Sequence, residues 1–132
     1  MLQEISSKFI SLFEKNPEVK VQAPGRINLI GEHTDYNLGF VLPAAINKYT
    51  FFAVGKNESK TATIHSADYN ETTQVAIHIQ KVKSNGWMKY MESMIIGLQE
   101  EGYYIDGFNL VFGGNIPIGA GLSSSAALTC GL

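Results

Sequence analysis

The run from Gly113 to Leu128 constrains the fold of this chain more than any other segment. It contains four glycines and one proline, then three consecutive serines, and it ends in residues that favour a helix. Apolar residues alternate with others over the preceding residues 108–112, as in a strand with one buried face. The pattern therefore predicts a strand, a glycine-rich loop and a helix in direct succession.

Such a loop can bind a phosphate group. Glycine N–H groups can converge on an anion, and the positive end of the following helix points to the same place. Serine hydroxyls can bind phosphate oxygens or reach a magnesium ion. No lysine follows the glycines as in a Walker A loop, and a serine replaces the third glycine of a dinucleotide-binding fingerprint. The residues alone leave two interpretations open, a phosphate-binding loop or a flexible turn with a serine N-cap.

Two further helices are indicated by apolar residues at helical spacing. The first covers about residues 2–15. The second has its apolar face from Trp87 to Leu98, with Ser84 or Asn85 as the expected N-cap and Gly102 as its end.

Strands are indicated by alternating residues in several short segments, and Pro24-Gly25 is expected to end the first of them. The segments are 19–23, 41–45, 49–54, 61–65 and 74–79. Strands grouped between helices, rather than alternating with them, predict an α+β domain and not a doubly wound sheet.

Composition excludes several classes of function. The 132 residues suffice for one domain, and a net charge of −2 without charged blocks gives no footprint for nucleic acid or an anionic membrane. A single cysteine excludes a disulfide framework within the chain, and no apolar run is long enough to cross a bilayer. The first fourteen residues resemble neither a signal nor a transit peptide, so we expect a cytoplasmic protein.

The segment 26–39 is a second candidate site, because it has neither helical nor strand periodicity and is rich in functional groups. Arg26 is the only arginine among ten basic residues, and a guanidinium suits phosphate or carboxylate recognition. Glu32, His33 and Asp35 place two carboxylates and an imidazole close together. Such a cluster can bind sugar hydroxyls, hold a divalent metal or cap a turn.

Both segments resemble motifs of one enzyme family. The run Gly25–Asn37, followed by Gly39 and Val41-Leu42-Pro43, resembles the signature of galactokinases, and the run Pro117–Ala127 is similar to the phosphate loop of the wider GHMP kinase superfamily. The resemblance implies that residues 1–132 form an incomplete N-terminal domain, with a mixed sheet like ribosomal protein S5 domain 2. Its sugar-binding signature would span residues 24–43 and its phosphate loop residues 117–127.

The resemblance also implies a reaction, in which the terminal phosphoryl group of ATP moves, with Mg²⁺, to the first-carbon hydroxyl of α-D-galactose. Arg26 would lie between the sugar and the transferred phosphoryl group. Glu32, His33 and Asp35 would bind the sugar hydroxyls, with Asp35 most closely tied to galactose stereochemistry. Galactose and ATP would be the partners of a monomeric parent protein.

The nucleotide contacts that the resemblance implies come from the second motif. Gly119, Gly121 and Ser123–Ser125 would surround the phosphates, with Ser125 as the contact to the metal. Trp87 would form a wall of the adenine pocket, although packing of its helix explains that residue equally well. The catalytic aspartate of the family would follow residue 132, so this chain is expected to be an inactive fragment.

Alternative functions remain. The parent protein could phosphorylate N-acetylgalactosamine, or it could be a galactose- and ATP-binding regulator without turnover, although the intact serine run favours an enzyme. A Rossmann-type dehydrogenase is disfavoured by the offset glycine pattern. Among the remaining polar residues, His65 and His78 are expected at the surface, Asp68 and Asp106 in turns, and Cys130 in the core.

Overall fold

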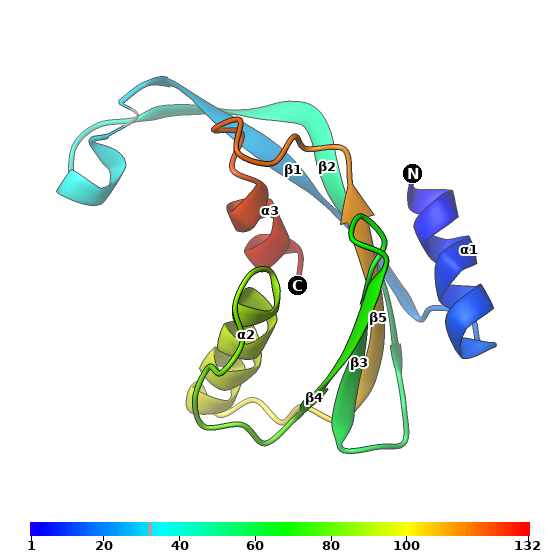
Figure 1. Ribbon diagram of the computed structural model, residues 1–132. Helices are drawn as coiled ribbons and strands as arrows, with labels where there is room; N and C mark the ends of the chain where they lie inside the picture. The colour runs from blue at the N-terminus through cyan, green and yellow to red at the C-terminus, as the bar shows by residue number, and fades with distance from the viewer. Residues whose placement is uncertain (32) are drawn as a thin grey trace.

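One five-stranded mixed sheet, with helices on both faces, organises the chain (Figure 1). The computed structural model describes residues 1–31 and 33–132. The elements in chain order are α1 (Leu2–Phe13), β1 (Val19–Ile30), the 3₁₀ turn η1 (Asp35–Asn37), β2 (Leu42–Lys56), β3 (Thr61–Ser66), β4 (Glu71–Ala76), α2 (Met88–Glu100), β5 (Phe108–Gly114) and α3 (Ser124–Gly131).

The strand order is β1-β2-β5-β3-β4. Neighbouring strands are antiparallel except for β3 and β5, which run parallel. This arrangement confirms the predicted α+β class. Among the described residues, no helix is both long and apolar enough to cross a membrane.

Helix α1 covers one face of the sheet, close to the predicted range. Its Ile5 and Phe9 are buried against Phe51, Ala53 and Val111 of the central strands. The apolar stripe seen in the sequence is therefore the face that docks on the sheet.

Helices α2 and α3 cover the opposite face (Figure 1). Met91 and Ile95 of α2 and Leu128 of α3 join the larger core cluster, which includes Phe52 and Leu110 of the sheet. Gly102 ends the C-terminal turn of α2 as predicted, with its N–H donating to the carbonyl of Gln99 at 3.0 Å. The predicted N-cap of α2 is wrong, because the cap position is Trp87 and no side chain caps it.

The prediction that Pro24-Gly25 ends the first strand is wrong. Strand β1 continues to Ile30, with a shift of its register between Pro24 and Arg26. β1 is an edge strand, where a residue without an N–H group costs little pairing. The two strands predicted at 41–45 and 49–54 are likewise one long strand, β2. Much of the segment 26–39 is therefore a hairpin rather than a loop.

Two predictions of burial are wrong. His65 is 3% exposed, because it is in register with Val111 of β5 on the face of the sheet that α1 covers, and its Nδ1 lies 2.8 Å from the Thr72 hydroxyl. Cys130 is exposed, since α3 buries Ala127, Leu128 and Gly131 instead. His78 is exposed, as predicted.

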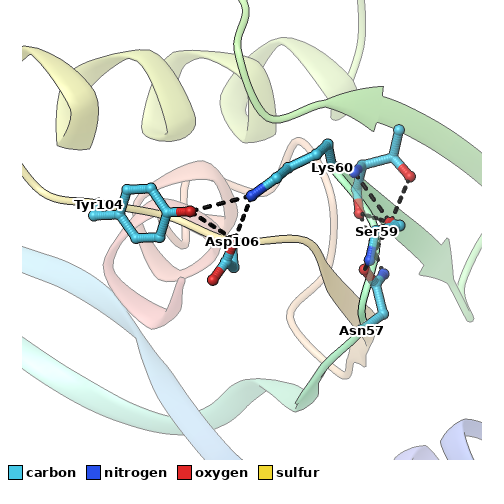
Figure 2. Close-up of polar contacts among 6 residues, drawn as sticks. Asn57, Ser59, Lys60, Tyr104 and Asp106 are labelled. Carbon is cyan, nitrogen blue, oxygen red and sulfur yellow. Dashed lines mark hydrogen bonds and ion pairs between the residues drawn. The ribbon is translucent and has the colours of Figure 1, made fainter.

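A polar network ties the β2–β3 turn to the segment between α2 and β5, as Figure 2 shows. The Lys60 ammonium contacts the Asp106 carboxylate at 2.9 Å and the Tyr104 hydroxyl at 3.1 Å. Asn57 and Ser59 hold the turn itself through a hydrogen bond of 2.7 Å between their side chains. This network lies at the end of the sheet away from η1 (Figure 1).

Candidate functional site

A cavity of about 270 Å³ lies between the sheet and the N-terminal ends of α2 and α3. Its walls come from strands β2 and β5, the β3–β4 turn, the first turn of α2 and the segment 116–125. The lining residues are Thr50, Asp68, Tyr69, Gly86, Trp87, Lys89, Tyr90, Phe112, Gly114, Ile116, Ile118, Ser124, Ser125 and Leu128. Aromatic groups and hydroxyls thus share one cavity, which suits a ligand with a flat ring and a polar end.

Trp87 forms one aromatic wall of this cavity. Its ring meets the ring of Phe112 edge-on, with 5.2 Å between centroids and 62° between planes. The indole N–H points to a carboxylate oxygen of Glu71 at 3.4 Å. Trp87 both packs against the core and lines the cavity, and its contact with an adenine base stays a prediction.

The glycine–serine loop leads into α3 at the edge of the cavity. Gly119 and Gly121 have φ values of +76° and +70°, with open space around the position of a Cβ, so conformation rather than room favours glycine there. The N–H of Ala127 makes the first bond of the helix, to the carbonyl of Ser123. Because N–H groups in a first helical turn have no acceptor within the helix, this end can receive an anion.

Some of the residues predicted to contact the nucleotide line the cavity, and others lie in the loop next to it. Ser124 and Ser125 line the same cavity as Trp87. Gly119 and Gly121 belong to the adjoining loop but not to the cavity wall. Ser123, in a left-handed conformation with φ 60°, precedes the helix and is also outside the wall.

Tyr90 links the two helices at this cavity. A hydrogen bond with the Ser125 hydroxyl lowers the pKa of Tyr90, and the nearby Lys89 ammonium, 5.0 Å from the ring centre, acts in the same direction. Tyr90 was not among the candidate residues. Its spacing of three from Trp87 places both on one face of a helix, which is the signal that could have identified it.

Asp68 is a second lining residue that the sequence did not mark as functional. It lies in the β3–β4 turn, as expected, and its carboxylate accepts the Gly114 N–H at 3.1 and 3.2 Å. Partial burial raises the pKa of Asp68, and the Gly114 N–H partly offsets that effect. A carboxylate near strand β5 has no local sequence signal, because the contact joins distant segments.

Arg26 lies beside the glycine–serine loop. Its backbone N–H donates to the carbonyl of Leu122 at 3.1 Å, and a Cβ on Gly25 would lie 2.8 Å from the same oxygen. The Arg26 side chain is exposed. The two motifs singled out from the sequence are thus joined directly, backbone to backbone.

The tip of the β1–β2 hairpin carries the second candidate cluster, away from α2 (Figure 1). His33 is exposed, and its Nδ1 lies 2.8 Å from the Tyr36 hydroxyl. Thr34 fixes the tip by donating to the carbonyls of Gly31 and Phe40 at 3.0 and 2.9 Å. The predictions for Glu32 and for the side chain of Asp35 fall outside the described residues.

The described part of the chain supplies few ligands for a metal ion. Residues 1–31 and 33–132 contain no group of three His, Cys, Asp or Glu side chains that could hold an ion. Ser125 offers one hydroxyl at the cavity. Because Mg²⁺ in such sites is usually bound by one or two carboxylates together with substrate phosphates, Ser125 can complete a site but cannot form one alone.

Comparison with known proteins agrees with this fold. The galactokinase galactose-binding signature matches residues 7–56, and the N-terminal domain of GHMP kinases matches residues 89–132. A mevalonate kinase from Methanococcus jannaschii has the same fold, with a TM-score of 0.68 and 22% identity over 86% of this chain and 37% of that one. The chain is therefore built as the N-terminal domain of a GHMP kinase.

Among GHMP kinases, the chain is more similar to galactokinases. A galactokinase from Staphylococcus carnosus is 44% identical over 97% of this chain, and one from Thermotoga maritima is 46% identical over 83%. The crystal structure of Lactococcus lactis galactokinase complexed with galactose has a TM-score of 0.82 and 38% identity over 97% of this chain. The chain is thus similar to galactokinases along nearly its whole length. It spans about a third of the length of these relatives, 34%, 30% and 34% respectively.

Proposed function

We propose that the chain is the N-terminal part of a galactokinase, which transfers the terminal phosphoryl group of ATP to the first-carbon hydroxyl of α-D-galactose. The observation that carries the proposal is the backbone contact between Arg26 and Leu122. It holds the beginning of the sugar-binding signature beside the glycine–serine loop, where a phosphoryl donor would meet a sugar acceptor.

The nucleotide would occupy the cavity beside α2 and α3. Its base would lie against Trp87, and its phosphates would meet the N-terminal turn of α3 with the hydroxyls of Ser124 and Ser125. Gly119, Gly121 and Ser123 would shape the loop around the phosphates. When bound, Mg²⁺ would neutralise charge on the phosphates, with Ser125 as its contact in this chain.

The sugar would bind at the hairpin, with its hydroxyls held by Glu32, His33 and Asp35. In the reaction the first-carbon oxygen forms a bond to the terminal phosphorus, the bond from that phosphorus to the bridging oxygen breaks, and ADP leaves. The Arg26 guanidinium would stabilise the charge on the transferred group. The base that receives the hydroxyl proton would belong to the rest of the protein, so this chain alone would be inactive.

The test is ADP release by the full-length protein with galactose, N-acetylgalactosamine and glucose offered separately. Turnover selective for galactose is the expected result. Turnover only on N-acetylgalactosamine would assign that sugar as the substrate instead, and saturable galactose binding without turnover would indicate a regulatory relative. We further propose a cytoplasmic, monomeric protein, which fractionation and sedimentation would test.

A further inference from the structure

Among the side chains that the structure describes, Glu92 carries the one buried acidic group that the proposed reaction does not use. It lies on α2, is 5% exposed, and uses both of its oxygens. Oε2 accepts the backbone N–H groups of Lys83 and Ser84 at 2.8 and 3.0 Å, and Oε1 accepts the Ser84 hydroxyl at 2.8 Å. Although burial by itself would raise the pKa of Glu92, the three donors hold it below its ordinary value.

These contacts hold the chain immediately before α2. Only Asn85 and Gly86 separate Ser84 from Trp87, and Gly86 adopts a left-handed conformation with φ +60° and open space around it. No side chain caps the helix at Trp87. The path of this short segment is therefore set by the Glu92 contacts on one side and by the helix on the other.

The same segment forms a wall of the cavity. Gly86 and Trp87 line it, whereas Met91 and Ile95 anchor the helix in the core independently of Glu92. Loss of the Glu92 contacts would leave α2 in place and release the segment that carries the indole. Because a displacement of about 1 Å in a binding group can cost up to about a hundredfold in rate, such a release would matter for the ligand.

We propose that Glu92 is a positioning residue for the nucleotide, which holds the Trp87 wall by binding the backbone of Lys83 and Ser84. The inference rests on the proposed function, since it assumes that the base lies against Trp87. Glu92 itself is not among the residues that line the cavity.

Substitutions at Glu92 separate positioning from charge. Glu92→Ala removes all three contacts. Glu92→Gln keeps them, because its carbonyl oxygen can accept both N–H groups while its amide donates to the Ser84 hydroxyl. In the full-length protein, we expect Glu92→Ala to raise the dissociation constant for ADP about tenfold and Glu92→Gln to stay within about threefold of the wild type. Galactose affinity should not change in either variant.

Gln99 provides a matched control on the same helix. Its side-chain amide donates to the Ile77 carbonyl, at the other end of the β4–α2 connection and away from the cavity. Gln99→Ala should lower thermal stability and leave ADP affinity unchanged. Hydrogen–deuterium exchange over residues 80–91 should be faster in Glu92→Ala than in Glu92→Gln, which reports the release of the segment without any ligand.

The outcomes are distinct. Equal ADP affinity in Glu92→Ala and wild type, or an equal loss in Gln99→Ala, would overturn the positioning role and leave the proposed function intact. A wild-type protein that binds galactose but no ADP would overturn both. If Glu92→Ala does not fold, Glu92→Asp takes its place, because its shorter side chain cannot reach both partners; ADP affinity equal to that of Glu92→Gln would overturn the proposal.

Discussion

Replacement of Gly131 by alanine tests the packing that fixes α3, and with it the serines at the cavity. A Cβ at this position would lie 2.2 Å from Cε2 and 2.6 Å from Cζ of Phe52, and 3.0 Å from the Cβ of Ala23, whereas ordinary contact is 3.4–4 Å. Phe52 is fully buried and stacks on Phe112, with 6.3 Å between ring centroids. The ring cannot move aside without displacing the core, so α3 has to move off the sheet.

The size of the effect follows from these distances. Relief of the clash needs a shift of about 1 Å, and a gap of that size forfeits about a quarter to a half of each dispersion contact along the helix. Overpacking in a well-packed core costs about 1–3 kcal/mol. The gain from removing a helical glycine is at most about 1 kcal/mol and offsets only part of that cost. We therefore expect Gly131→Ala to lower the free energy of unfolding by about 1–3 kcal/mol.

Gly97 in α2 gives the matched control, since nothing lies within 4 Å of its Cβ position. Gly97→Ala should raise the free energy of unfolding by about 0.5–1 kcal/mol through helix propensity alone. Urea titrations of the two variants and of the wild-type full-length protein measure the difference. If Gly131→Ala were as stable as the wild type, the close approach of α3 to Phe52 would be refuted as a determinant of the fold.

Three further substitutions test the proposed site and the buried histidine. Arg26→Ala should lower kcat by more than about a hundredfold with little change in galactose affinity, as measured by steady-state kinetics and calorimetry; equal losses in both would contradict its role in the transition state. Trp87→Ala should raise the KM for ATP about tenfold more than that for galactose, because an aromatic contact to the base is lost. Burial, with Lys8 nearby, lowers the pKa of His65, so stability is complete above its ordinary value of 6.5 and falls as the pH drops towards the lower, folded value. Urea midpoints at pH 7.5 and 5.5 should differ less in His65→Gln than in the wild type.

The spacing of apolar residues predicted those helices and strands that have a regular apolar pattern along their own length. The stripe of α1 forms its one buried face, and the apolar residues of β5 are buried on both faces of the sheet, so both elements could be located from the sequence. The glycine–serine loop was equally predictable, because its strand, turn and helix are adjacent in the chain. Its proposed ligand rests on the resemblance and on the cavity, not on periodicity.

The errors arose where two distant segments meet. Strand β3 has Ala62 and Ile64 in the core on one face, which suggests that the next residue, His65, is exposed. His65 is in register with Val111 of β5, however, and α1 covers that face of the sheet. The donors to Glu92 and the contact of Tyr90 with Ser125 likewise depend on tertiary packing. No period in the sequence marks residues that become neighbours only across elements.

The error at Pro24-Gly25 also explains how the two motifs come together. An edge strand has backbone N–H and C=O groups without strand partners, and these can bind a loop from another element. Pro24 supplies a residue without an N–H group, and Gly25 has no Cβ to keep the Leu122 carbonyl away. The shift of register there leaves the Arg26 N–H directed to Leu122. The residues that resemble a strand terminator therefore join the sugar-binding signature to the glycine–serine loop, and they do so within a continuous strand.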